Sequence, residues 1–235
     1  MRSAEHDDGY SGVENLEVMQ DAVNYNRFLL DTVRAHCPRG ARVLDFGAGG
    51  GQFAVPLAEL GLNVTALEPD ERLRARISGK GLRAVATPQA LADASFEYIY
   101  TLNVLEHIED DVVALQALQA KLTPGGTLLV YVPAFPLLYT SMDAKVGHVR
   151  RYTRTTLLAA VRAAGFQVDS VGYVDSLGFF AALAFKAVGA RGGDINPRAL
   201  KLYDRAIFPI SRLIDPLARR CLGKNLLLIA RNGAG

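Results

Sequence analysis

Apolar residues recur with two different spacings along the chain, and the two spacings alternate. Short apolar runs that end at turn residues predict strands at 41–46, 64–67, 98–102 and 127–132, with weaker ones at 83–86, 166–173 and 226–230. Apolar positions at helical spacing predict helices at 53–60, 72–77, 111–122 and 154–164. The Thr-Pro-Gly-Gly sequence at 123–126 predicts a turn. This order predicts an α/β fold with a parallel, doubly wound sheet.

Both ends of the chain depart from the alternation. Apolar residues between Leu16 and Val33 predict one or two helices before Pro38. We therefore expect a helical segment at 1–37, frayed over its first twelve residues (1–12), followed by the main domain at 38–235. The main domain is expected to carry a helical addition at about 177–225, with helices at 179–188 and 200–222 and a loop at 189–197.

Basic residues lie among the apolar residues of the segment 200–222, at Arg205, Arg212, Arg219 and Arg220. This pattern is typical of helices that rest on an anionic membrane surface or cover a hydrophobic acceptor. The alternative is an extra helical layer on the sheet or a dimer contact. The sequence leaves both a monomer and a homodimer open.

Composition narrows the class of protein. The 235 residues suffice for one sizeable domain with additions, and half of them are apolar. The net charge of +2 is dispersed, which disfavours a nucleic-acid partner. Cys37 and Cys221 form no metal-binding spacing, so we expect no metal. The N-terminus is acidic and the longest apolar stretch, 177–190, is too short to span a bilayer, so we expect a cytoplasmic protein.

The clearest motif is a glycine-rich turn after the first predicted strand, Asp-Phe-Gly-Ala-Gly-Gly-Gly at 45–51. Asp45, Gly47, Gly49 and Gly51 follow an acidic-x-Gly-x-Gly-x-Gly pattern, whereas a dinucleotide-binding loop needs a glycine where this chain has Gln52. The carboxylate would repel a pyrophosphate and favours a ligand with an ammonium group and a sulfonium. The motif therefore disfavours a dinucleotide-dependent oxidoreductase.

A second acidic residue, Glu68, ends the next predicted strand. A carboxylate at that position accepts hydrogen bonds from both hydroxyls of a ribose, and Asp70 belongs to the same turn. The alternative is structural, with Glu68 and Asp70 capping the helix that begins near Arg72. Combined with the glycine-rich turn, Glu68 favours the ligand interpretation.

The segments 43–51, 66–70, 96–108 and 122–132 resemble the successive motifs of class I S-adenosylmethionine-dependent methyltransferases. The resemblance covers about residues 40–135 and implies S-adenosylmethionine as the cofactor. It also implies a Rossmann-like, mostly parallel seven-stranded sheet whose last strand is antiparallel. Family members often cover the cofactor with N-terminal helices, so the segment 1–37, which contains Tyr25, is expected to be a lid.

The resemblance assigns residues of the cofactor site by position. The methionine part is expected to be lined by Asp45, Gly47, Ala48 and Gly49, with Gly51 completing the glycine pattern and backbone contacts from Asn103 and Val104. Glu68 is expected to hold the ribose. The adenine is expected near Pro69, Asp70, Gln89 and Ala90. An acidic residue often meets the adenine amino group in the family, and here we expect the Gln89 side chain or a backbone N–H to replace it. His107 is expected to fasten its loop to the next helix.

The segment 139–153, after the fifth predicted strand, faces the same crevice and gathers polar groups. Its Gly-His-x-Arg-Arg-Tyr sequence resembles a segment of uncharacterised bacterial members of the superfamily. His148 is expected to be a general base with Asp143 as its partner, or else a loop histidine bonded to Asp143 for structure. Arg150 and Arg151 either bind an acidic group of the acceptor or form surface salt bridges. The expected acceptor contacts are Tyr25, Tyr139, Arg150, Arg151 and Tyr152.

Taken together, these observations predict a methyltransferase for a small or amphiphilic, lipid-like acceptor. The methyl group is expected to reach an oxygen atom by in-line SN2 transfer. A cofactor-binding module without methyl transfer, in a regulatory or assembly role, is the alternative. A nucleic-acid methyltransferase is disfavoured because no Asn/Asp-Pro-Pro-Tyr sequence follows the fourth predicted strand.

Overall fold

The computed structural model describes residues 18–188 and 196–233. Within these residues, seven strands form one sheet in the order β3-β2-β1-β4-β5-β7-β6. Strands β1 to β5 are parallel, and β7 lies antiparallel between β5 and β6. The predicted Rossmann-like, mostly parallel sheet with an antiparallel last strand is confirmed. The strands are β1 Arg42–Phe46, β2 Asn63–Leu67, β3 Ala84–Val85, β4 Phe96–Leu102, β5 Leu122–Pro133, β6 Phe166–Val174 and β7 Asn225–Asn232.

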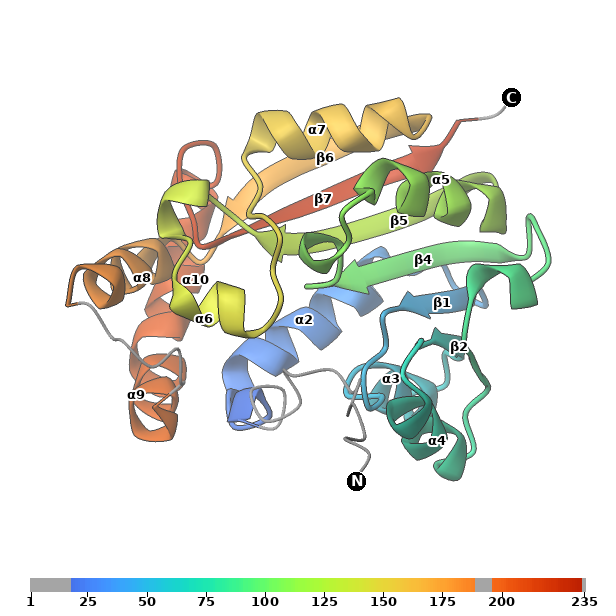
Figure 1. Ribbon diagram of the computed structural model, residues 1–235, viewed down its shortest axis with the longest axis horizontal. Helices are drawn as coiled ribbons and strands as arrows, with labels where there is room; N and C mark the ends of the chain where they lie inside the picture. The colour runs from blue at the N-terminus through green and yellow to red at the C-terminus, as the bar shows by residue number, and fades with distance from the viewer. Residues whose placement is uncertain (1–17, 189–195, 234–235) are drawn as a thin grey trace, which may run out of the picture.

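Helices cover both faces of the sheet, as in a doubly wound fold (Figure 1). On one face Leu115 of α5 and Leu157 of α7 are buried, and on the other Leu29 of α2, Leu57 of α3 and Ile77 of α4 are buried. These helices are α2 Val23–His36, α3 Ala54–Glu59, α4 Glu71–Gly79, α5 Asp111–Lys121 and α7 Arg154–Ala163. The predicted frayed segment 1–12 and residues 189–195 of the predicted loop 189–197 lie outside the described residues.

Strand β4 shows how the two faces are filled. Ile99 belongs to the core on the α5 side, whereas Tyr98 and Tyr100 belong to the core on the α2 side. This is the two-residue alternation of a strand that is buried on both faces. The Tyr98 hydroxyl also donates a hydrogen bond of 3.0 Å to the carbonyl of Val33, so β4 holds α2 against the sheet.

The turn predicted at 123–126 is an irregularity inside β5 and does not precede the strand. Phe96 of β4 pairs with Leu122, but Tyr98 pairs with Thr127. The residues between these two pairs form a bulge on the β5 side. Gly125 has a φ of 75°, which favours glycine. The Pro-Gly-Gly signal was therefore correct about the backbone bend and wrong about where the strand begins, which is Leu122.

The helix predicted at 200–222 is divided into three parts. The α-helices α9 Pro197–Leu202 and α10 Phe208–Ala218 are separated by a π-helical segment, η4 Tyr203–Ile207. The carboxylate of Asp204 in η4 is buried and accepts hydrogen bonds from the backbone N–H groups of Asn24 and Tyr25, both at 2.9 Å. The C-terminal helices therefore hold the first turn of α2. With α8 Ser176–Val188 they lie beyond the carboxyl ends of the parallel strands (Figure 1).

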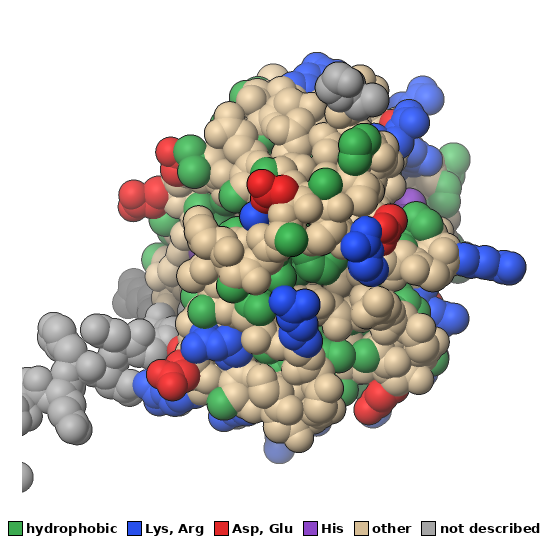
Figure 2. Space-filling view, turned by 90° about the vertical axis from the view of Figure 1, so that its right-hand side faces the viewer, with side chains coloured by type: hydrophobic (Ala, Val, Ile, Leu, Met, Phe, Trp, Pro, Cys, Tyr) green, Lys and Arg blue, Asp and Glu red, His purple; other side chains and the backbone are tan. Residues whose placement is uncertain are grey.

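The surface at the amino ends of the parallel strands carries Lys and Arg side chains interspersed with Asp and Glu (Figure 2). This mixture agrees with the dispersed charge of the sequence. Within the described residues, each helix is too short or too polar to cross a membrane.

Candidate active site

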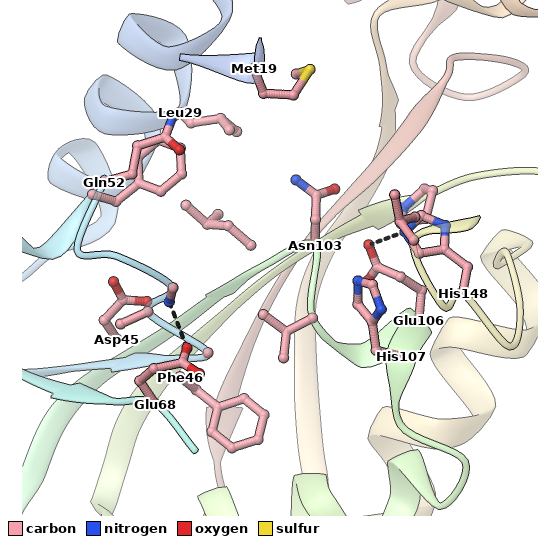
Figure 3. A pocket seen from close by; sticks show the side chains of 18 of the residues that line it. Met19, Leu29, Asp45, Phe46, Gln52, Glu68, Asn103, Glu106, His107 and His148 are labelled. Atoms are coloured by element: carbon pink, nitrogen blue, oxygen red, sulfur yellow. Dashed lines mark hydrogen bonds and ion pairs between the residues drawn. The ribbon is translucent and has the colours of Figure 1, made fainter. Parts of the chain in front are cut away.

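A cavity of about 690 Å³ lies at the carboxyl ends of β1, β2 and β4, the edge at which open α/β sheets bind ligands. Asp45 and Glu68 lie at one end of it and Glu106 and His148 at the other, with Asn103 between them (Figure 3). Of the residues predicted for the site, the cavity is lined by Tyr25, Asp45, Gly47, Ala48, Gly49, Glu68, Pro69, Asp70, Asn103, Val104, His148 and Arg151.

The glycine-rich turn between β1 and α3 needs glycine for two different reasons. Gly47 has a φ of 79°, and a Cβ atom there would lie 2.4 Å from a methyl group of Val104. Gly47 thus lets the loop after β4 approach the turn. Gly51 has a φ of 82°, and a Cβ atom there would lie 2.9 Å from Val55 and 3.2 Å from Ile77. Gly51 permits the packing of α3 on α4 and does not line the cavity.

Asp45 ends β1 with a carboxyl group that is only 3% exposed. Its Oδ2 atom has no hydrogen-bond partner, although Asp45 lines the cavity. Burial, reinforced by the nearby charge of Glu68, raises the pKa of Asp45 to about 7. A buried acceptor without a partner is unfavourable unless a ligand supplies a donor. Asp45 therefore fits a ligand that brings a positively charged amino group.

Glu68 braces the glycine-rich turn against the end of β2. Its Oε2 accepts a hydrogen bond of 2.7 Å from the Gly49 N–H, and its Oε1 accepts one of 2.9 Å from the Asp70 N–H. Burial raises the pKa of Glu68. Asp70 caps α4 by accepting a hydrogen bond of 3.0 Å from the Leu73 N–H. The capping alternative is present for Asp70, yet both acidic residues line the cavity, and each oxygen of Glu68 keeps a lone pair for a further donor.

The loop after β4 brings Asn103 and Val104 to the cavity, but the loop after β3 does not bring Gln89 and Ala90 there. Asn103 adopts a φ of 55°, and its side-chain amide lies 3.4 Å from the hydroxyl of Tyr25. Gln89 and Ala90 lie on a short 3-10 helix, Pro88–Ala90, with exposed side chains. The adenine contact predicted for this pair is not supported by its position, because β3 is only two residues long and its loop ends outside the cavity.

Asp143 organises the loop at 139–153 from a fully buried position on the short helix α6 Ser141–Lys145. Its carboxylate accepts hydrogen bonds from Arg151 Nε at 2.7 Å, Arg151 Nη2 at 3.1 Å and the Thr140 N–H at 2.8 Å, and it lies 2.8 Å from His148 Nδ1. Burial alone would raise the pKa of Asp143, but the bonds from His148 and Arg151 outweigh it and hold the pKa below its usual range. Asp143 is thus an ionised partner that fixes His148.

Three predicted acceptor contacts lie outside the cavity lining. Tyr139 donates a hydrogen bond of 2.7 Å to the carbonyl of His148. Arg150 forms an ion pair of 3.0 Å with Asp111. Tyr152 is 2% exposed and donates a hydrogen bond of 2.6 Å to the same carboxylate. Residues 150–152 are extended beside the end of β5, so consecutive side chains point in opposite directions. Arg151 therefore points to the cavity while Arg150 and Tyr152 support the loop from behind.

The prediction missed two charged groups of the cavity wall. Glu106 is fully buried, neither carboxylate oxygen has a hydrogen-bond partner, and burial raises its pKa to about 8. Lys224 precedes β7, and burial lowers its pKa. Glu106 stands in the motif segment after β4, which was the available signal. Lys224 had no signal, because its position depends on β7 pairing with β5.

Glu106, His107 and His148 each direct a ligand atom into one small region of the cavity wall (Figure 3). These atoms all lie within 4.8 Å of one another, and His148 Nε2 is 3.8 Å from Glu106 Oε1. Burial and the neighbouring His148 lower the pKa of His107 to about 4, although the backbone at Val146 and Gly147 hydrogen-bonds its ring. The cluster fits either proton transfer or a divalent cation.

The parallel sheet with its antiparallel last strand, the cavity and the acidic glycine-rich turn define a class I S-adenosylmethionine-dependent methyltransferase. Within this superfamily the chain belongs to the methyltransferase-domain family, whose model matches residues 17–171. The matched region contains α2, the glycine-rich turn and the loop at 139–153.

Curated relatives match part of the chain. The ubiquinone biosynthesis O-methyltransferase of Xanthomonas axonopodis pv. citri is 30% identical over 157 residues, which are 57% of this chain and 66% of the relative. The one of Caulobacter sp. is 35% identical over 101 residues, 39% of this chain and 40% of the relative. The chain thus matches less than two thirds of the length of these relatives. A solved S-adenosylmethionine-dependent methyltransferase from Thermotoga maritima has a TM-score of 0.65 at 18% identity, covering 93% of this chain and 94% of that one, and shows the same fold.

Proposed function

We propose that the protein methylates an oxygen atom of a small or amphiphilic acceptor with S-adenosylmethionine as the methyl donor. One observation carries the proposal: a single cavity joins the buried Asp45 carboxylate, whose Oδ2 has no hydrogen-bond partner, to a His148 imidazole that is fixed by Asp143. The similarity to O-methyltransferases of ubiquinone biosynthesis supports an oxygen acceptor.

The residues around the glycine-rich turn would hold the cofactor. Asp45 would accept hydrogen bonds from the amino group, the turn at 47–49 would contact the methionine part, and Glu68 would accept bonds from the ribose. Pro69 and Asp70 line the adjoining wall, where the adenine would lie. When bound, S-adenosylmethionine supplies a methyl group on a positively charged sulfur.

At the other end of the cavity, His148 would act as the general base. Because Asp143 is an acceptor, the Nδ1 atom of His148 carries the proton, and Nε2 is left to receive one. The acceptor hydroxyl would lose its proton to Nε2 as its oxygen bonds to the methyl carbon, and the bond between that carbon and the sulfur would break to leave S-adenosylhomocysteine. Glu106, 3.8 Å from Nε2, would accept a hydrogen bond from the resulting imidazolium, and Arg151 would keep Asp143 in place. Tyr25 would close the cavity from α2.

We further propose a cytoplasmic enzyme, either a monomer or a homodimer, that acts on an acceptor of amphiphilic character. Leucines at positions 213 and 217 of α10 are 80% and 87% exposed, and the cavity is lined mostly by apolar side chains and the glycine-rich backbone. An acceptor with a lipid-like tail would match both features.

Calorimetry with S-adenosylhomocysteine and with NAD tests the cofactor. Tight binding of the first and none of the second is expected, and the reverse would overturn the proposal. Transfer of a labelled methyl group to phenolic and enolic compounds, and to a cell extract, tests the reaction. We expect His148→Ala to keep its affinity for S-adenosylhomocysteine and to lose about 10²- to 10⁴-fold in turnover. Cofactor binding without any labelled product would instead support a cofactor-binding module.

A further inference from the structure

Helix α10 presents an apolar stripe that no described part of the chain covers. Ile210, Leu213, Ile214 and Leu217 are spaced by three and four residues, so they lie on one side of the helix. Their exposed fractions are 52%, 80%, 37% and 87%. The opposite side of the helix is buried through Phe208, Ser211 and Asp215. The stripe is therefore the outer face of a helix whose inner face is packed.

The neighbouring helices α8 and α9 also carry exposed apolar side chains. Leu202 at the end of α9 is 66% exposed, and Phe180 and Phe185 on α8 are 54% and 39% exposed. Elsewhere in the described chain, large exposed apolar residues such as Leu60 and Val113 are far apart in sequence and belong to different elements. A concentration on adjacent helices marks an interaction site rather than ordinary surface variation.

The exposed charged side chains of α9, η4 and α10 are all basic. The acidic residues between 196 and 222 are Asp204 and Asp215, and both are buried, at 2% and 5% exposure. Asp204 is bonded to α2, and Asp215 accepts hydrogen bonds from the backbone N–H groups of Asp175 and Ser176. The exposed basic side chains between 196 and 222 are Arg198, Lys201, Arg205, Arg219 and Arg220, of which Lys201 also pairs with Asp21 at 3.1 Å.

We propose that this face, formed by the exposed side chains of α8, α9, η4 and α10, binds the surface of an anionic lipid bilayer. Leucine side chains would enter the interface while the arginines meet lipid phosphates and carboxylates. A second copy of the chain is a poorer partner, because a symmetric contact would bring the same arginines together. Charge complementarity therefore selects the lipid surface.

The inner side of the same helices holds α2, which lines the cavity. Phe208 contacts the rings of Tyr25 and Phe28 with centroids 5.6 and 5.8 Å apart, and the Arg212 guanidinium lies 3.8 Å from the centre of the Phe28 ring. Lys201 also pairs with Asp21 at 3.1 Å. Lipid binding would thus place α2 and the cavity next to the bilayer. This step rests on the proposed function, and it assigns the acceptor to molecules dissolved in the membrane.

Co-sedimentation of the full chain with phosphatidylcholine vesicles, with and without phosphatidylglycerol, tests the proposal. Binding is expected only to vesicles containing phosphatidylglycerol and is expected to weaken with added salt. The variant Leu213→Glu/Leu217→Glu is expected to bind these vesicles at least about tenfold more weakly, because two apolar side chains lose their burial. Arg219→Gln/Arg220→Gln is expected to weaken binding and to reduce its dependence on salt.

Val113→Glu is the matched control, since it replaces a 56% exposed apolar residue on α5, away from this face, and its vesicle binding is expected to be unchanged. Equal binding by the leucine double variant would overturn the proposal. So would light scattering that shows a dimer of the wild-type chain which this variant abolishes. Calorimetry with S-adenosylhomocysteine keeps the two proposals apart, because the vesicle variants are expected to retain wild-type affinity for it whether or not the lipid proposal holds.

Discussion

Asp45→Asn separates what the Asp45 carboxylate does for a ligand from what it does to the ligand-free protein. The substitution keeps the size of the side chain and removes its charge. In the ligand-free protein the carboxylate is 3% exposed and its Oδ2 has no hydrogen-bond partner, so the charge is unfavourable there. In the complex the same charge would meet an ammonium group. We therefore expect the variant to be more stable and to bind its cofactor more weakly.

The size of the expected change in stability follows from the pKa of Asp45, which burial raises from 3.8 to about 7. The native state holds this proton more tightly than the unfolded chain does, so the free energy of unfolding is greatest below about pH 4 and falls as the pH rises to 7. The rise in pKa corresponds to a loss of at most about 4 kcal/mol above pH 7. Asn does not titrate, so the stability of the variant does not fall in this way as the pH rises. Losing a hydrogen bond to a charged donor costs about 1.5–3 kcal/mol, or about 10- to 150-fold in Kd.

Urea unfolding at pH 5 and pH 8 and calorimetry with S-adenosylhomocysteine measure both effects. The variant is expected to exceed the wild type in stability by about 1–3 kcal/mol at pH 8, with a smaller difference at pH 5. Asp31→Asn, which changes an exposed carboxylate of α2, is the control and should alter neither quantity. An unchanged affinity for S-adenosylhomocysteine, or a loss of stability at pH 8, would refute the reasoning.

Three other predictions concern the loops of the site. Gly47→Ala is expected to lower the free energy of unfolding by about 1–3 kcal/mol, because its Cβ would lie 2.4 Å from Val104. Gly61 also has a positive φ, 88°, but open space around it, so Gly61→Ala measures the backbone contribution alone. Equal losses of stability in both variants would contradict the clash with Val104. Tyr152→Phe removes the hydrogen bond to Asp111, so it is expected to lower stability by about 1–3 kcal/mol and to leave the acceptor KM unchanged. A raised KM at unchanged stability would show that Tyr152 contacts the acceptor. Chelation with EDTA is expected to leave turnover unchanged, because the base that we propose, His148, needs no metal. Loss of turnover that zinc restores would show that Glu106, His107 and His148 bind a metal ion.

The alternation of strands and helices was predictable because it is a local property. The central strands β1, β2, β4 and β5 are largely buried on both faces and the helices that flank them on one, so apolar spacing reports the element directly. The bulge at 123–126 shows the limit of this argument. Thr-Pro-Gly-Gly specifies a bend, but only the pairing of Leu122 with Phe96 keeps the preceding residue in the sheet.

The two ends of the proposed site also differ in how far the sequence could predict them. The proposed cofactor end is built from residues at the carboxyl ends of β1 and β2, so the sequence at 45–51 and Glu68 was enough to predict it. The acceptor end depends on the direction of each side chain in a loop. The Arg-Arg-Tyr sequence places three functional groups together, and the extended backbone beside Ala134 decides that only Arg151 points inward.

What the sequence determined by itself is the class of fold and the acidic glycine-rich turn, because both follow from contacts between residues that are close in the chain. Tertiary structure alone decided that Glu106 lies buried without a partner beside His148, that Lys224 joins the cavity wall through β7, and that Asp204 holds α2 from the other end of the chain. Each of these contacts joins segments that are distant in sequence, and the packing of the sheet and its helices brings them together.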